Sequence, residues 1–321
     1  MTHDPRFMAC ALSLSQRGRG RTAPNPNVGC VIVAANHVVG RGWTQPGGRP
    51  HAEAMALAEA RGAARGATAY VTLEPCAHVS PRGPACADLL AEAGIARLVV
   101  ALRDPDPRTD GLGLARLRDA GIEIVTDVGA AEAREAMGGF LTRRRLGRPF
   151  VTLKLATSLD GRIARPDGES RWITGPESRA HAHLERARHE AILVGRGTFA
   201  ADQPRLDVRL AGLEDRAPRR ILLTRGEAAP GWERIADPTE IAGLDGVDHL
   251  LVEGGAETAS SFLRAGLVDR LLLYRAPILI GSGKAALGDI GLGRLADAHG
   301  RWRLAESRQL GSDRLEVYRA G

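Results

Sequence analysis

Three potential metal ligands lie in two short stretches of the chain, and a fold must bring them together if they bind one ion. His51 lies within residues 50–53, and Cys76 lies within residues 74–78, ten residues before Cys86. One imidazole and two thiolates leave a fourth tetrahedral position for water, which is the layout of a catalytic zinc site. Taken singly, each residue could be a helix cap or a core side chain. Together they indicate a metal site.

A carboxylate beside these ligands suggests what the metal site does. Zinc makes a bound water acidic, but a departing group still needs a proton. Glu53 stands two residues after His51 and is not needed as a ligand, so it could carry that proton. His-x-Glu followed by Pro-Cys and a second Cys is the signature of zinc nucleobase deaminases. His78 is a candidate for substrate contact, and a supporting or surface role for it stays open.

The apolar pattern along the chain predicts strands that alternate with helices of about ten residues, which is typical of layered α/β domains. Helices are expected over residues 5–18, 51–61, 85–93, 114–120, 130–137 and 176–188, with one of about eleven residues after Gly255. Strands are expected over residues 28–35, 38–43, 69–73, 96–102, 122–125, 151–156, 191–194, 221–224, 249–253 and 271–274.

A length of 321 residues favours two domains. The basic stretch at residues 143–149, interrupted by glycine and proline, predicts a boundary that separates a domain at 1–147 from one at 148–321. We interpret this arginine run as a solvated linker, with a phosphate-contacting role as the alternative.

Composition narrows the class of protein. A net charge of +6 and a pI near 9.7 favour acidic partners, yet the arginines are spread along the chain and aromatic residues make up only 4%. These features argue against a nucleic-acid surface. No apolar run reaches membrane-spanning length, and residues 1–5 lack a signal-peptide pattern, so a cytoplasmic protein is expected. Cys10 and Cys30 lie in apolar contexts and are expected to be core thiols.

The motifs together resemble the RibD family, in which a pyrimidine deaminase is fused to a reductase of riboflavin biosynthesis. The resemblance covers essentially the whole chain and is carried by residues 24–29, 51–53, 72–78, 154–161 and 170–174. It implies a cytidine-deaminase-like layered α/β domain followed by a dihydrofolate-reductase-like α/β domain. It further implies deamination of 2,5-diamino-6-(5-phosphoribosylamino)pyrimidin-4(3H)-one, then reduction of the ribosyl group by NADPH, in a homo-oligomer.

The resemblance also assigns roles to individual residues of this sequence. In the first domain it implies zinc on His51, Cys76 and Cys86, proton transfer by Glu53, and substrate contacts from Asn25, His78 and Arg82. In the second it implies NADPH contacts from Ala156, Trp172, Thr198, Asp202, Gly255, Ala256, Glu257, Thr258, Ala259, Ser260 and Ser261. The implied reductase substrate contacts are Ser170, Arg186, Leu206, Arg209 and Glu253.

Elementary chemistry supports part of this assignment. Gly254-Gly255 between a strand and a helix lets backbone N–H groups approach a pyrophosphate, and a guanidinium such as Arg186 or Arg209 suits the substrate phosphate. Residues 195–200 resemble a G-x-G-x-x-A turn. No acidic residue ends the next strand, whereas Arg225 follows it, which suits NADP; a solvated surface role for Arg225 is the alternative.

The sequence departs from the family pattern at three places: the loop at residues 79–85 is one residue longer, Thr44 replaces a frequent histidine, and the segment at 220–253 is short. Two other functions stay open. One is a nucleic-acid-directed zinc deaminase with a C-terminal binding module. The other is a deaminase whose reductase half is inactive.

Overall fold

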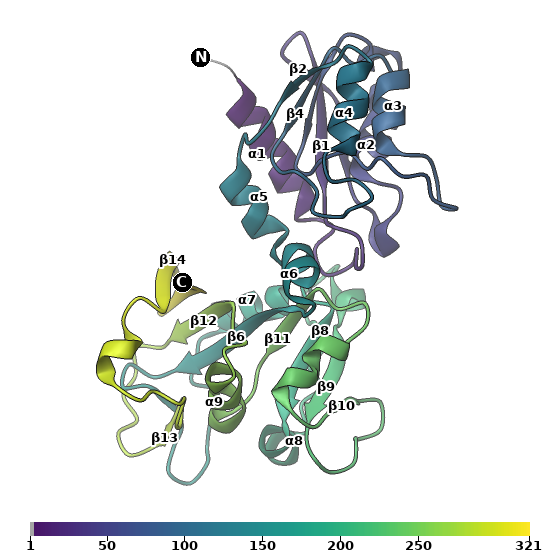
Figure 1. The fold of residues 1–321 in the computed structure, drawn as a ribbon. Helices are drawn as coiled ribbons and strands as arrows, with labels where there is room; N and C mark the ends of the chain where they lie inside the picture. The colour runs from purple at the N-terminus through teal and green to yellow at the C-terminus, as the bar shows by residue number, and fades with distance from the viewer. Residues whose placement is uncertain (1–2) are drawn as a thin grey trace. The chain divides into compact units, whose positions relative to one another are not determined.

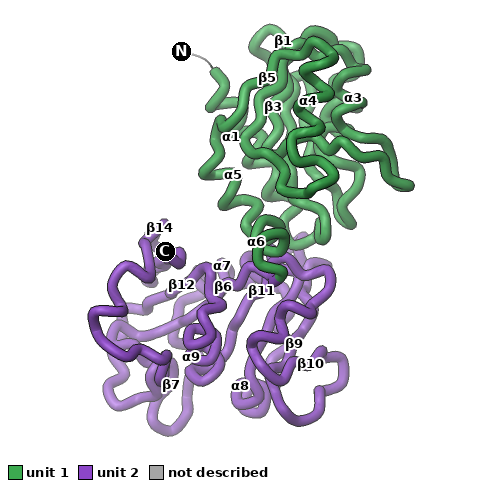
Figure 2. The backbone as a smooth tube through the Cα atoms, viewed as in Figure 1, with its two compact units in different colours: residues 1–147 green, residues 148–321 purple. Residues whose placement is uncertain are grey.

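A computed structural model describes residues 3–321 of the chain. The chain forms two compact units, residues 1–147 and residues 148–321 (Figure 2). Each unit has its own sheet flanked by helices (Figure 1). The fold class expected from the sequence, two successive α/β domains, is confirmed.

A five-stranded sheet in the order β2-β1-β3-β4-β5 forms the centre of the first unit. Strand β1 is antiparallel to both of its neighbours, whereas β3, β4 and β5 are parallel. The strands are β1 (Gly29–Ala34), β2 (His37–Trp43), β3 (Thr68–Val71), β4 (Arg97–Val100) and β5 (Glu123–Val125). The helices are α1 (Asp4–Ser15), α2 (Ala52–Ala60), α3 (Cys86–Glu92), α4 (Leu112–Asp119), α5 (Ala130–Ala136) and α6 (Gly138–Leu146), with 3-10 turns η1 (Pro46–Gly48) and η2 (Arg61–Ala64).

Helix α2 lies directly against strand β2 because two glycines leave room for it. A Cβ atom on Gly40 would lie 2.2 Å from the carbonyl oxygen of Ala56, and one on Gly42 would lie 2.0 Å from that of Ala52. No side chain larger than hydrogen fits at such distances. This close packing fixes the N-terminal end of α2, where His51 is the N-cap residue.

The arginine run near the unit boundary is helical, which corrects the prediction of a linker there. Arg143, Arg144 and Arg145 lie in the last turn of α6, and Gly147 ends this helix in the left-handed conformation. Cationic side chains in a last helical turn interact favourably with the negative end of the helix dipole. The chain therefore leaves the first unit only at Gly147.

The second unit contains an eight-stranded sheet in the order β10-β9-β8-β11-β6-β12-β15-β14. The pairs from β10 to β12 are parallel, and β15 and β14 are added antiparallel. The strands of this sheet are β6 (Phe150–Thr157), β8 (Ala191–Gly195), β9 (Arg219–Leu223), β10 (Glu233–Ile235), β11 (His249–Val252), β12 (Arg270–Arg275), β14 (Trp302–Leu310) and β15 (Asp313–Ala320). A separate two-stranded sheet pairs β7 (Arg162–Ala164) with β13 (Lys284–Ala285). The helices are α7 (Pro176–Arg186), α8 (Arg196–Asp202) and α9 (Ala256–Arg264), with 3-10 turns η3 (Glu214–Arg216), η4 (Pro238–Gly243) and η5 (Leu295–Ala298).

Alternation along β12 shows how the helices of this unit cover both faces of the sheet. Leu271 and Leu273 pack against the cluster that contains Phe262 of α9. Tyr274 points to the opposite face, where its hydroxyl is 2.7 Å from Nδ1 of His181 on α7. No strand beyond residue 274 is predicted from the sequence, yet the β14–β15 hairpin forms the edge of the sheet.

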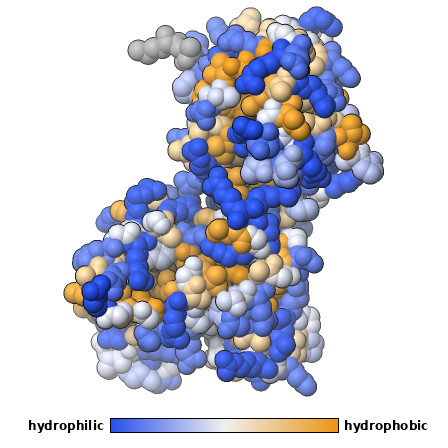
Figure 3. Space-filling view, viewed as in Figure 1, coloured by the Kyte–Doolittle hydropathy of each residue, from blue (hydrophilic) through white to orange (hydrophobic). Residues whose placement is uncertain are grey.

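The surface has the mixed character of an ordinary folded protein. Hydrophobic residues lie scattered among hydrophilic ones on the face drawn in Figure 3. Among residues 3–321, no helix has the length and apolar content to cross a bilayer.

Candidate functional site

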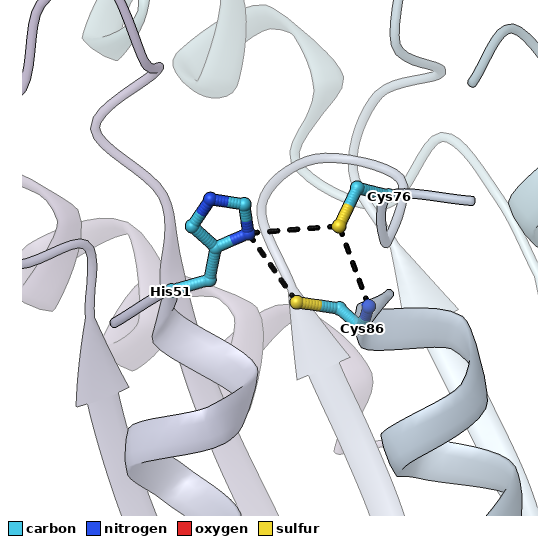
Figure 4. Close-up of side chains that lie close together, drawn as sticks. All are labelled: His51, Cys76 and Cys86. Atoms are coloured by element: carbon cyan, nitrogen blue, oxygen red, sulfur yellow. Dashed lines mark hydrogen bonds between the residues drawn. The ribbon is translucent and has the colours of Figure 1, made fainter. Parts of the chain in front are cut away.

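The three predicted metal ligands come together at one point of the first unit (Figure 4). His51 caps the start of α2, Cys86 is the first residue of α3, and Cys76 lies in the loop that follows β3. The Nδ1 atom of His51 is 3.6 Å from Sγ of Cys76 and 3.4 Å from Sγ of Cys86. One ligand atom from each residue lies within 4.8 Å of the others.

These atoms fit a zinc ion. Zinc–sulfur and zinc–nitrogen bonds in a tetrahedral site place nitrogen and sulfur about 3.6 Å apart, which agrees with both measured separations. A hydrogen bond with Cys86 lowers the pKa of the Cys76 thiol below its ordinary value, so one sulfur is held in the form that binds metal. The donor set of one imidazole and two thiolates leaves one tetrahedral position open.

Asn25 holds the imidazole ring from the side away from the sulfurs. Its amide lies 3.0 Å from Nε2 of His51 and also donates to the carbonyl oxygen of Gly48 over 3.1 Å. A Cβ atom on Gly48 would lie 2.6 Å from Cγ of Asn25, and Gly48 has φ +87°, so this position requires glycine. The contact orients His51 so that Nδ1 points at the two cysteines.

A pocket with a volume of about 190 Å³ opens beside the ligands and is lined entirely by residues of the first unit. Glu53 lines it and is 3% exposed. Burial raises the pKa of the Glu53 carboxyl to about 7. Asn25 lines the same pocket, so the predicted substrate residue and the predicted proton carrier face one space.

The predicted substrate residues His78 and Arg82 also line this pocket. Nδ1 of His78 is buried and has no hydrogen-bond partner among the described residues. The lengthened loop closes through a bridge between Ser80 and Gly83, and Arg82 donates to the Gly47 carbonyl over 2.8 Å. Thr44, in place of the frequent histidine, accepts a hydrogen bond from the backbone N–H of Val28.

Another wall of the pocket contains three residues that sequence reasoning missed, together with Arg144 of the arginine run. Asp104, Asp106, Arg108 and Arg144 form this wall. Asp106 pairs with Arg108 at 2.7 Å and with Arg144 at 3.0 Å, and burial raises the pKa of Asp104 to about 6. The aspartate-proline repeat at residues 104–107 is the sequence feature that could have indicated this wall of the pocket.

One carboxylate connects that wall to the ligand loop. Glu74 is 3% exposed and accepts hydrogen bonds from the backbone N–H groups of Asp104, Gly111 and Leu114. It stands two residues before Cys76. The Glu74 side chain therefore connects the backbone at residues 104–114 to the loop that carries Cys76.

The second unit has a larger pocket of about 910 Å³ at the carboxyl ends of its parallel strands. Ligands of open α/β sheets bind at such ends. All five predicted substrate residues line it: Ser170, Arg186, Leu206, Arg209 and Glu253. Among the predicted NADPH residues, the pocket is lined by Ala156, Trp172, Thr198, Asp202 and Gly255 but not by Ala256, Glu257, Thr258, Ala259, Ser260 or Ser261, which lie in α9.

The chain is tightly packed at the start of α9. A Cβ atom on Gly254 would lie 2.4 Å from Cβ of Thr258, so no larger residue fits there. The hydroxyl of Thr198 accepts a hydrogen bond of 3.0 Å from the N–H of Gly255. The N-terminus of a helix suits an anionic group such as a pyrophosphate.

Arg186 is engaged within the protein, which alters its expected role. Its Nε and Nη2 atoms bind the Glu253 carboxylate over 2.8 and 2.9 Å, and its Nη1 donates to the Asp207 carbonyl. Lys154 approaches the same carboxylate at 3.8 Å. Although burial opposes ionisation, the charges of Arg186 and Lys154 lower the pKa of Glu253 to about 2. Arg209 pairs with Asp207 at 3.4 Å through its Nε atom, and its side chain is 60% exposed.

The charge of this pocket fits polyanionic ligands. Seven lysine and arginine side chains line it against three carboxylates. Asp202, a predicted NADPH contact, pairs with Arg171 at 3.0 Å. Arg225 follows β9 as an exposed residue and does not line the pocket. Strand β8 ends at Gly195 and α8 begins at Arg196, so residues 196–200 are helical and no separate turn precedes the helix.

Two family models match the chain, one for each unit. The cytidine and deoxycytidylate deaminase zinc-binding region matches residues 1–102. The RibD C-terminal domain matches residues 149–242 and 239–315.

Curated relatives and solved structures agree with these matches over nearly the whole chain. The riboflavin biosynthesis protein RibD of Escherichia coli is 40% identical, with 97% of each chain covered, and that of Aquifex aeolicus is 39% identical, covering 90% of this chain and 91% of the other. Acinetobacter baumannii RibD superposes with a TM-score of 0.90 at 35% identity over 99% of both chains. A Thermotoga maritima protein described as a diaminohydroxyphosphoribosylaminopyrimidine deaminase/5-amino-6-(5-phosphoribosylamino)uracil reductase gives 0.88 at 32% identity, again over 99% of both.

Proposed function

The chain belongs to the RibD family of bifunctional deaminases and reductases of riboflavin biosynthesis, and we propose which of its residues perform each reaction. The first unit deaminates 2,5-diamino-6-(5-phosphoribosylamino)pyrimidin-4(3H)-one to 5-amino-6-(5-phosphoribosylamino)uracil. The second unit then reduces the ribosyl group to ribityl with NADPH. The observation that carries the proposal is that each unit holds its own pocket, one beside a zinc-type donor set and one lined by cations.

In the deaminase pocket, His51, Cys76 and Cys86 would hold zinc, which supplies a polarised water as nucleophile. Glu53 lies in the same pocket and takes a proton on a carboxylate oxygen, then delivers it to the departing amine. Asn25 orients the imidazole and contacts the pyrimidine. His78 and Arg82 contact the rest of the substrate from the opposite loop.

In the reductase pocket, NADPH would supply a hydride. Trp172, Thr198, Asp202 and Gly255 at the start of α9 would hold the cofactor, and the N-terminus of this helix suits its pyrophosphate. The remaining residues from Ala256 to Ser261 support this site through the helix.

The reductase substrate is bound on the other side of the same pocket by Ser170, Leu206, Arg209 and the Arg186–Glu253 pair. The Arg186 guanidinium is bound to the buried Glu253 carboxylate, whereas Arg209 makes only a longer pair of 3.4 Å with Asp207 and has a 60% exposed side chain. Arg209 is therefore the arginine that meets the substrate phosphate. Arg186 instead keeps Glu253 ionised and in place.

The test is to supply the phosphoribosylamino-pyrimidine and to follow ammonia release and NADPH consumption separately. Glu53→Ala should abolish ammonia release while zinc, measured by elemental analysis, stays bound. Glu59→Ala is the matched control, since Glu59 lies on the same helix but pairs with Arg41 at the surface. Deamination by Glu53→Ala at the rate of the control would refute the role of Glu53.

The second activity has its own variant. Asp202→Asn should slow NADPH consumption and leave ammonia release unchanged. RNA binding with a steep salt dependence and without NADPH oxidation would instead favour a nucleic-acid-directed deaminase.

We also propose that the chain acts on small molecules in the cytoplasm as a dimer or tetramer. A reducing compartment keeps Cys76 and Cys86 available as thiolates. The edge strand β14 is exposed along residues 303–309 and offers unpaired backbone groups for self-association. Light scattering coupled to size-exclusion chromatography would give the oligomeric state.

A further inference from the structure

Lysine is almost absent from this chain, and both of its copies line one pocket. The sequence has 44 lysine and arginine residues, of which only Lys154 and Lys284 are lysines. Both line the pocket of the second unit. Lys154 has a partner there, since it approaches the buried Glu253 carboxylate. Lys284 is not among the residues to which the proposed reductase reaction assigns a role.

Lys284 is held over the pocket by a short sheet. It lies on β13, which pairs antiparallel with β7 so that Lys284 is opposite Ala164. A Cβ atom on Gly283 would lie 2.1 Å from the Ala164 carbonyl oxygen, so glycine is needed for the two strands to meet. Ahead of β13, the Asp160 carboxylate accepts hydrogen bonds from the N–H groups of Ile280 and Gly281 over 3.2 and 2.7 Å.

The other cations of the pocket are already engaged. Arg171 pairs with Asp202, Arg186 and Lys154 with Glu253, and Arg205 and Arg209 with Asp207, while Arg179 donates to the Thr174 carbonyl and stacks on Trp172. Among residues 3–321, Lys284 is the pocket cation for which the structure records no carboxylate, carbonyl or ring partner. Its side chain is exposed toward the space where an anionic ligand would lie.

We propose that Lys284 binds a phosphoryl group of a ligand held in this pocket, as a positioning residue that acts from the β7–β13 sheet. The proposal rests on the proposed reductase function, whose cofactor and substrate both carry phosphate. An ammonium on a flexible stem interacts with phosphate as a point charge and needs no fixed fork geometry. That property suits a contact made from a short two-stranded sheet.

Equilibrium binding to the full-length protein tests the contact directly. The Kd of NADPH, NADH and ribose 5-phosphate is measured by calorimetry for the unchanged protein, Lys284→Met and Lys284→Arg. Arg303→Met is the matched control, because it removes one exposed positive charge from the same unit outside the pocket. Lys284→Met should weaken at least one of the three probes by about five- to twentyfold, and Lys284→Arg should recover part of the loss.

The three probes identify the phosphate. If Lys284→Met weakens the binding of NADPH alone, Lys284 contacts the 2′-phosphate. If it weakens NADPH and NADH equally, Lys284 contacts the pyrophosphate. If it weakens ribose 5-phosphate alone, Lys284 contacts the substrate phosphate. Unchanged affinity for all three, or an equal loss in Arg303→Met, overturns the proposal. If the unchanged protein binds none of the probes, the proposed reductase function fails instead.

The scarcity of lysine allows a second, activity-free readout. Reductive methylation with carbon-13 formaldehyde keeps the amine charge and labels only Lys154, Lys284 and the terminal amine. The carbon-13 NMR signal that is missing from the spectrum of Lys284→Arg belongs to Lys284. This signal should shift when the protein is titrated with the probe that Lys284→Met binds more weakly. A Lys284 signal that stays fixed at saturation also overturns the proposal.

Discussion

Replacing Arg186 by methionine should destabilise the second unit by leaving a buried carboxylate without its partner. The Glu253 side chain is 7% exposed and receives two hydrogen bonds from the Arg186 guanidinium. Lys154 remains at 3.8 Å after the substitution but makes no such pair of bonds. Removing one partner of a buried ion pair costs more than removing both, because the remaining charge is no longer compensated.

The pKa of Glu253 gives the size of the effect. A carboxyl whose pKa falls from 4.5 to about 2 is stabilised in its ionised form by about 3 kcal/mol. Because most of that stabilisation comes from Arg186, we expect Arg186→Met to lower the free energy of unfolding by about 3 kcal/mol at pH 7. Arg186→Met should also weaken binding in the reductase pocket, because Glu253 loses its fixed position.

The pH dependence should reverse in this variant. In the unchanged protein the folded pKa of Glu253 lies below its unfolded value, so its contribution is present above pH 4.5 and is lost as the pH falls toward 2. Without Arg186, burial raises the pKa of Glu253, and the carboxyl then stabilises the fold most when protonated. The free energy of unfolding that Arg186→Met loses relative to the unchanged protein should therefore be smaller at pH 5 than at pH 7.

Urea unfolding followed by tryptophan fluorescence measures this deficit. Three of the four tryptophans lie in the second unit: Trp172, Trp232 and Trp302. The double variant Arg186→Met/Glu253→Gln removes the uncompensated charge and should recover most of the lost stability. A loss below about 1 kcal/mol at pH 7, or a double variant as unstable as the single one, would refute this account of the pair.

Three further outcomes are expected. Glu53→Gln should lose ammonia release by at least a hundredfold while bound zinc stays at the level of the unchanged protein, because the amide cannot accept the proton; release within tenfold of normal would contradict it. Gly254→Ala should weaken NADPH binding at least tenfold, measured by cofactor fluorescence, because its Cβ would overlap Thr258; unchanged binding would show that the helix start is not the cofactor site. Asp4→Asn should lower the stability of the first unit by about 1 to 2 kcal/mol at pH 7, because Asp4 binds Arg97 through two hydrogen bonds of 2.9 Å. Since this pairing lowers the pKa of Asp4, the difference from the unchanged protein should shrink as the pH falls below about 4, and urea unfolding followed by circular dichroism would show whether it does.

The metal site could be predicted from the sequence because its ligands lie in short, recognisable motifs. His51 and Glu53 lie in one helical turn, and Cys76 and Cys86 are only ten residues apart. The Gly254-Gly255 pair is also recognisable in the sequence, because two glycines between a strand and a helix are typical of a site where a phosphate approaches the helix N-terminus.

Contacts between distant residues could not be predicted in the same way. Arg186 and Glu253 are 67 residues apart, so the sequence shows a cation that suits phosphate but not the carboxylate that occupies it. Helix α6 was obscured by its three arginines, which resemble a solvated linker until the last helical turn is seen. Strand β14 escaped prediction because both of its faces are exposed, which removes the apolar alternation of a half-buried strand.

The contacts of Glu74 imply that substrate selection and metal binding in the deaminase can change independently. The Glu74 carboxylate binds residues 104–114 through their backbone N–H groups, and the side chains of Asp104 and Asp106 take no part in these hydrogen bonds. We therefore expect substitutions of Asp104 and Asp106, which line the pocket, to change which base binds without loss of the metal ion. A library randomised at Asp104 and Asp106 with Glu74 kept is thus a natural starting point for directing this fold toward other exocyclic amines.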